Sequence, residues 1–144
     1  MVLEELFQIF QNTDTKCISV GEFDIEKISF IKEKCPEALD NIKKYTILLW
    51  KERIEHIEKH SYDVSGLSAE EMINLIPDIL KNPDYIGCKP NENDFQFIKK
   101  FRNNILVAVR ANKKNNLIFR TMYTITESQL NDYIKKGKAW KFRG

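Results

Sequence analysis

Hydrophobic residues in the middle of the chain recur at helical spacing. A stripe with apolar residues every three or four positions follows Ser68, which together with Glu71 has the spacing of a capping box. This pattern predicts a helix that kinks or restarts at Pro77. We expect it to end at Asn82, because Pro83 disfavours helical backbone at the residue before it.

The spacing changes from helical to alternating in the second half of the chain. Residues 95–101, 104–111 and 117–125 are rich in strand-forming residues and are joined by short polar segments. Consecutive strands with short connections predict an antiparallel meander.

A second capping box, formed by Thr126 and Gln129, follows the last of these strands. An apolar stripe continues from it at helical spacing as far as Gly137, a residue that commonly ends a helix. The sequence therefore predicts a helix close to the C-terminus.

The first 60 residues are harder to assign. Residues 45–50 are a short apolar run that fits a strand or a helical turn, and residues 52–60 change to helical spacing. Residues 3–10 fit one face of a helix, but they also fit a strand joined by a turn at residues 12–14 to a second strand at 17–20. The pattern leaves both readings open.

These segments predict an α+β fold, with an N-terminal helical part, then an antiparallel sheet of three to four strands, and then a C-terminal helix. A chain of 144 residues has the size of a single domain, here residues 1–144. We expect residues 45–137 to form its core and residues 1–44 to be an N-terminal extension of uncertain structure.

The charge of the chain is unevenly distributed. Its net charge is only +2, which argues against a strongly cationic nucleic-acid binder. Residues 1–80 nevertheless hold nine Lys and Arg against 16 Asp and Glu, and residues 81–144 hold 14 against five. The second part, at +9, is therefore the part expected to meet an anion, unless the asymmetry reflects chance on a solvated surface.

The sequence also indicates a compartment. No signal peptide and no transmembrane run is recognisable, so we expect a cytoplasmic protein with no membrane partner. Cys17, Cys35 and Cys88 are odd in number and widely spaced, which favours reduced thiols over a disulfide framework.

His56 and His60 are the only histidines, and their spacing of four places them on one side of the predicted helix. His60 falls at the edge of the apolar stripe, where a half-buried imidazole would face a cleft. The segment lacks the H-E-x-x-H pattern of zinc proteases and no third ligand is evident, so a metal site is not expected. A plain pair of surface histidines is the alternative.

Arg110 and Arg120 interrupt strands that are otherwise apolar. An arginine in such a place needs a partner, which is either a phosphate or an acidic residue of the helices. Alternation along the last strand puts Thr121 and Tyr123 on one face and Arg120 with Met122 on the other. Whether the two arginines share a face depends on the turn between their strands and stays open.

The order and spacing of several segments resemble those of the phage-associated nucleases of the barnase, EndoU, colicin and RelE-like superfamily. The resemblance covers about residues 45–137 and lies in the segments His56–His60, Asn82–Gly87, Phe97–Lys100, Asn104–Arg110 and Phe119–Tyr123. It implies an α+β fold whose antiparallel sheet carries a metal-independent ribonuclease site, with no cofactor.

Metal-free RNA cleavage needs a base, an acid and cations that hold the charge of the transition state. On this resemblance, His60 is the general base or acid and His56 its partner, while Arg120 and Arg110 hold the phosphate. The remaining candidates are Thr121 or Tyr123 as a hydrogen-bond donor, and Lys99 and Lys100 along the RNA backbone.

The expected partners are RNA and, for a toxin-like nuclease, an acidic inhibitor protein or antitoxin. Two other functions compete with this one. The first is a non-catalytic module of the same fold that binds RNA or protein through the basic sheet. The second is a metal-dependent hydrolase that uses His56 and His60.

Overall fold

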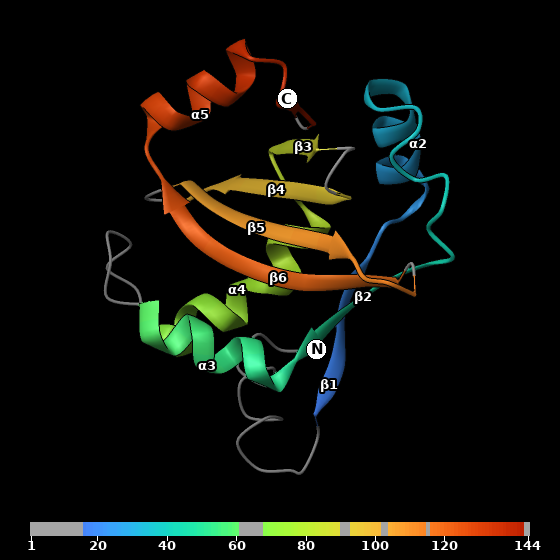
Figure 1. Ribbon diagram of the computed structural model, residues 1–144. Helices are drawn as coiled ribbons and strands as arrows, with labels where there is room; N and C mark the ends of the chain where they lie inside the picture. The colour runs from blue at the N-terminus through green and yellow to red at the C-terminus, as the bar shows by residue number, and fades with distance from the viewer. Residues whose placement is uncertain (1–15, 61–67, 90–92, 102–103, 115, 143–144) are drawn as a thin grey trace.

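The computed structural model describes residues 16–60, 68–89, 93–101, 104–114 and 116–142 (Figure 1). Its helices and strands, in chain order, are β1 (Cys17–Glu22), α2 (Ile25–Lys34), β2 (Lys44–Trp50), α3 (Lys51–His60), α4 (Ala69–Lys81), β3 (Tyr85–Lys89), β4 (Asp94–Lys100), β5 (Asn104–Ala111), β6 (Asn116–Ile125), α5 (Glu127–Lys135) and β7 (Ala139–Lys141).

The described strands form one seven-stranded mixed sheet in the order β1-β2-β6-β5-β4-β3-β7. Strands β2 and β6 are parallel, and the other neighbours are antiparallel. The expectation of an N-terminal helical part followed by three to four antiparallel strands was therefore wrong, because the helices are interspersed among the strands of a larger, mixed sheet. Local periodicity detected β2 but could not show that it pairs with a strand about 70 residues later.

The early part of the chain belongs to the same sheet. Residues 17–20 adopt the strand alternative as part of β1, which pairs with β2. Phe23, just after β1, packs edge-on against Phe95 and at a tilt against Phe97 of β4, with ring centroids 5.2 and 5.4 Å apart. Residues 3–10 and the turn at 12–14 lie outside the described part of the chain.

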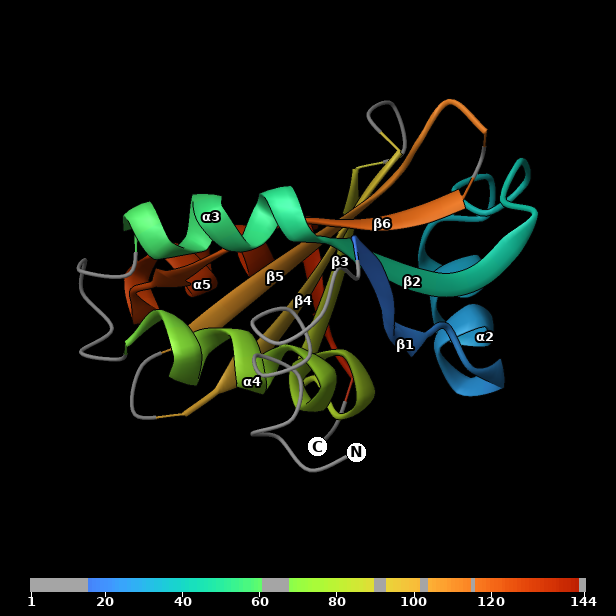
Figure 2. The ribbon, with the colours of Figure 1, turned by 90° about the horizontal axis from the view of Figure 1, so that it is seen from below.

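The predicted meander is confirmed as β4, β5 and β6, which pair antiparallel in sequence order. Their side chains alternate between two cores. The larger core contains Val107 of β5 together with Ile54 of α3 and Ile73 of α4. The smaller core contains Leu106 of β5 and Leu130 of α5. Helix α5 thus lies across the sheet from α3 and α4, as Figures 1 and 2 show.

Both capping boxes are confirmed. The side chain of Ser68 accepts a hydrogen bond from the backbone of Glu71 while that of Glu71 accepts one from Ser68, and Thr126 and Gln129 bond in the same way. Helix α4 is continuous through Pro77. Gly137, just after α5, has φ +68°, a left-handed conformation that suits the end of a helix.

The cysteines depart from the expectation of reduced thiols. A disulfide joins Cys35, directly after α2, to Cys88 in β3, and Cys17 is the free cysteine. The two bonded residues are 53 positions apart, and only the packing of α2 against the sheet brings them together.

Among the described residues, no helix is both long enough and apolar enough to cross a bilayer.

Candidate active site

A row of polar side chains crosses the side of the sheet that faces α5. In β4 the two phenylalanines face the larger core, so alternation turns Asp94 and Gln96 to the other side. The pairing register places Lys89 of β3, Asp94 of β4 and Arg110 of β5 opposite one another. This arrangement gathers charged groups from strands that are adjacent in Figure 1.

Asp94 is the buried anion of this row. Its side chain is only 2% exposed, and the Nε of Arg110 lies 3.7 Å from its Oδ1 while the Nη1 of Arg120 lies 3.5 Å from its Oδ2. The Nε2 of Gln96 donates a hydrogen bond to Oδ2 at 3.2 Å. The carboxylate thus has three polar neighbours, as a buried charge requires.

The two arginines hold Asp94 loosely and stay open to solvent. Both distances exceed the roughly 2.7–2.9 Å of a charge-assisted hydrogen bond. Their side chains are 37% and 40% exposed. Two guanidinium groups around one carboxylate carry a net positive charge, so this part of the sheet attracts a second anion.

A β-bulge explains how Arg120 reaches this side. Ala108 pairs with Thr121 and Val109 pairs with Phe119, which leaves Arg120 as the extra residue of β6. Strict alternation would have separated Arg120 from Thr121, and that expectation was wrong. Thr121 pairs with Ala108 of the smaller core, and Arg120 contacts Asp94 on the same side. The arginines of β5 and β6 therefore share a face.

Tyr123 of β6 brings its hydroxyl group close to Arg120 and to the hydroxyl group of Tyr133 in α5. Tyr123 is 41% exposed. Its partial burial, together with the hydrogen bond between its hydroxyl and that of Tyr133 and the charge of Asp94, raises the pKa of Tyr123 to about 12, although Arg120 acts in the opposite direction. Tyr123 is therefore protonated throughout the physiological pH range and can donate a proton.

The sequence reasoning missed Lys89, Asp94, Gln96 and Tyr133. The signal for two of them was present, because Asp94 and Gln96 alternate with phenylalanines in a strand and therefore had to share the face opposite the larger core. No pattern pointed to Tyr133, which lies on a helix remote in sequence from β4.

The structure does not bring His56 to the arginines. His56 is exposed on α3, and Ile54 and Ile57 of that helix pack in the larger core, on the far side of the sheet from Asp94. His60 is the last residue of α3, and its side chain lies outside the described part of the structure. In the part of the chain that the structure describes, no three side chains of His, Cys, Asp or Glu gather closely enough to hold a metal ion.

Lys99 and Lys100 also lie away from Asp94. The Nζ of Lys99 donates a hydrogen bond to the backbone oxygen of Asn82 at 2.8 Å and lies 3.7 Å from Asp78. The Nζ of Lys100 lies 3.7 Å from Glu127. Lys100 is six residues along β4 from Asp94, which is about 20 Å in an extended strand.

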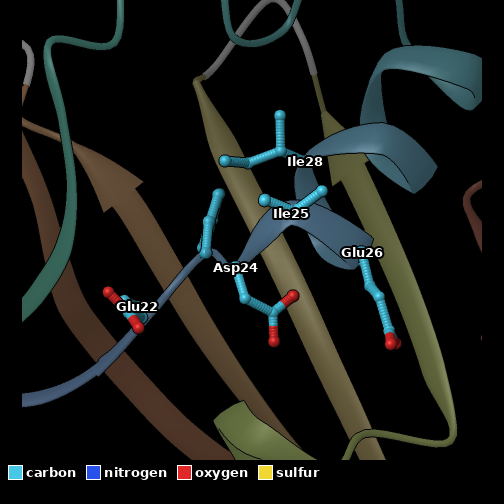
Figure 3. A pocket seen from close by; sticks show the side chains of 6 residues that line it. Glu22, Asp24, Ile25, Glu26 and Ile28 are labelled. Atoms are coloured by element: carbon cyan, nitrogen blue, oxygen red, sulfur yellow. The ribbon is translucent and has the colours of Figure 1, made fainter.

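A separate hollow of about 530 Å³ lies where β1 leads into α2 (Figure 3). Its lining includes three acidic residues, Glu22, Asp24 and Glu26. Asp24 caps the helix and pairs with Lys27 at 2.9 Å. Acidic lining repels a phosphate, so this hollow does not compete with the arginine pair as an anion site.

Comparison with known families identifies the domain. Residues 25–132 match the family described as phage-Barnase-EndoU-ColicinE5/D-RelE like nuclease3. The chain belongs to this family. No curated protein and no solved structure shows significant similarity to it.

Membership in this nuclease family confirms the resemblance found in the sequence and indicates a nuclease-like domain. The match begins at Ile25, so it includes α2 as well as the core expected from residue 45 onward. It contains Asp94, Arg110, Arg120 and Tyr123, and it ends one residue before Tyr133.

Proposed function

We propose that this nuclease is a metal-independent endoribonuclease whose reaction takes place over the α5-facing side of β4, β5 and β6. The observation that supports the proposal most directly is the pair of half-exposed arginines around the buried Asp94. Asp94 fixes their position without neutralising both, so a phosphodiester can take the remaining positive charge.

The chemistry follows from these side chains. The 2′-hydroxyl of a ribose gives its proton to a solvent water as its oxygen attacks the adjacent phosphorus, the phosphorane-like transition state gains negative charge, and the bond to the 5′-oxygen breaks. Arg110 and Arg120 stabilise the gained charge. Tyr123, whose high pKa keeps its proton in place, supplies that proton to the 5′-oxygen, and Tyr133 orients its hydroxyl.

Two partners follow from the proposal. The first is RNA, because only a ribose offers the 2′-hydroxyl. The second is an acidic inhibitor protein, which would bind the same cations that hold the phosphate and would thereby block the site.

The test is cleavage of single-stranded RNA in excess EDTA. We expect the wild-type protein to produce fragments that end in a 2′,3′-cyclic phosphate and to leave the matching DNA intact. The double variant Arg110→Ala, Arg120→Ala should not cleave. Salt-sensitive RNA binding without cleavage would instead support the non-catalytic module, and activity that appears only with added zinc would support metal-dependent hydrolysis.

A further inference from the structure

More cations gather beside the arginine pair than a single phosphate needs. Lys89 of β3 and Lys138, in the turn after α5, border a cavity of about 10 Å³ together with Gln96 and Tyr133. Gln96 also donates its hydrogen bond to Asp94. The lysines therefore lie on the β3 side of Asp94, and the two arginines reach Asp94 from β5 and β6.

The fold holds both lysines in this place. Lys89 is the direct register partner of Asp94 and is half-buried at the end of β3. The backbone oxygen of Lys138 packs so closely on Gly87 that a Cβ there would collide with it. The backbone nitrogen of Lys138 donates to the oxygen of Tyr133 at 2.8 Å. Gly87 thus lets the turn after α5 lie directly on the sheet.

The charges on this side do not balance. Within the described residues, neither Lys89 nor Lys138 has a carboxylate within 4 Å, and Asp94 is the acid that both arginines contact. Asp132 lies close enough for Lys138 to lower its pKa, after the larger effect of Lys136. The cationic side chains on this side therefore outnumber the acids beside them, and a bound polyanion would reduce their mutual repulsion.

We propose that Lys89 and Lys138 form a second phosphate subsite beside the arginine pair, so that the substrate is a polynucleotide strand that crosses β6, β5, β4 and β3. This inference rests on the proposed function and adds to it a site for a second phosphate of the same strand. A substrate with one phosphate engages only Arg110 and Arg120. A strand with two or more engages the lysines as well, and its affinity rises accordingly.

Binding of short 2′-deoxyoligonucleotides tests the subsite independently of cleavage, because without a 2′-hydroxyl they resist the proposed reaction. The probes are a dinucleoside monophosphate, which has one phosphate, and a pentanucleotide. The proteins are the wild type, the double variant Lys89→Ala, Lys138→Ala, and the control Lys51→Ala. Lys51 is an exposed lysine at the start of α3, on the other side of the sheet.

We expect the double variant to bind the pentanucleotide more weakly and to lose about 1.4 from the slope of log affinity against log salt, since each contact to a single strand contributes about 0.7. Its affinity for the dinucleoside monophosphate should match that of the wild type. Lys51→Ala should behave as the wild type with both probes, and thermal unfolding of each variant should confirm an intact fold.

Equal slopes for the double variant and Lys51→Ala, or no binding of the pentanucleotide by the wild type, would overturn the subsite. RNA cleavage by the same wild-type preparation is scored separately. If the wild type cleaves RNA but the double variant and Lys51→Ala have equal salt slopes, the proposed ribonuclease is supported and the subsite is not. If the double variant has a reduced salt slope but the wild type does not cleave RNA, the subsite is supported and the ribonuclease is overturned.

Discussion

Two buried charges in this molecule have opposite arrangements. At the start of α2 the buried member is a cation, Lys27, whose side chain is 1% exposed. Its Nζ lies 2.9 Å from Asp24, at hydrogen-bond distance, and 5.8 Å from the centre of the Phe142 ring. The exposed partner is the acid. We call this ion pair closed, because one buried cation has one acid at hydrogen-bond distance.

On the α5 side of the sheet the buried member is the anion Asp94, and the exposed partners are two arginines at 3.5 and 3.7 Å. We call this ion pair open, because the cations outnumber the acid and keep part of their surface in solvent. We expect the closed pair to contribute to folding, and the open one to cost folding free energy that a bound anion offsets. On the proposed function, the first ion pair stabilises the fold and the second is arranged for a ligand.

Loss of one arginine should have the largest effect. Arg120→Ala removes a charge that acts on the transition state, so we expect kcat/KM for RNA to fall by about 10²–10³, or about 3–4 kcal/mol. The free energy of unfolding should change by only about 1 kcal/mol, because Asp94 keeps Arg110 and Gln96. Steady-state cleavage and urea unfolding measure the two quantities.

Two further variants sharpen this result. Arg120→Lys keeps the charge but lacks the planar fork, so it should recover only part of the activity. Arg53→Ala removes an exposed arginine from α3, on the other side of the sheet, and should leave kcat/KM unchanged. If the Arg120→Ala protein unfolds at a much lower urea concentration but has normal activity while folded, then Arg120 stabilises the fold and does not act in the reaction.

The closed pair should behave in the opposite way. Lys27→Ala removes a buried cation and its packed stem, so we expect the free energy of unfolding to fall by about 2 kcal/mol. The cleavage rate of the folded protein should not change, because Lys27 contacts Asp24 and Phe142, and neither belongs to the arginine site. Lys32→Ala, an exposed lysine of the same helix, is the matched control. A large loss of kcat/KM in folded Lys27→Ala would blur the distinction between the two pairs.

The contrast also explains which features the sequence could predict. Capping boxes and alternation are local, so Ser68 with Glu71, Thr126 with Gln129, and the three strands of the meander were predicted correctly. The parallel pairing of β2 with β6 depends on contacts between distant segments, and no local pattern encodes it.

The candidate site was predicted only in part. Arg110 and Arg120 stand out because a charge inside an apolar strand needs a partner, but the partner itself, Asp94, became visible only with the strand register. The bulge at Arg120 changes the face of one residue, and alternation cannot anticipate that. Titration range and spacing drew attention to His56 and His60, although neither property reveals which side of a sheet a helix covers.

The tyrosine pair predicts a smaller and purely local effect. Because the pKa of Tyr123 is raised from 10.0 to about 12, the folded protein keeps a proton between about pH 10 and 12 that the unfolded chain releases. Its contribution to stability is fully present below pH 10 and is lost as the pH rises through 12. Tyrosinate absorbance should therefore show one tyrosine that titrates late, and Tyr123→Phe should abolish this step and the associated loss of stability.

The same titration has a matched control in Tyr85→Phe, which removes a half-buried tyrosine of β3. That variant should keep the late step. Tyr133→Phe should move the step to lower pH, because the hydrogen bond that Tyr123 donates to the hydroxyl of Tyr133 is one of the causes of the raised pKa of Tyr123. A late step that survives in Tyr123→Phe would assign the perturbed proton to another group and would remove Tyr123 as the proposed acid.

Loss of a histidine should have the smallest effect. His56 is exposed on α3, and the sheet separates it from Asp94 and both arginines. Surface substitutions of this kind change free energies by about 0.5 kcal/mol or less, so His56→Ala should keep kcat/KM within about twofold of the wild type. The pH profile of RNA cleavage by the wild type should also lack the bell shape that a histidine acid or base produces. A hundredfold loss of kcat/KM in His56→Ala would assign proton transfer to α3, and the open arginine pair would then act only in binding.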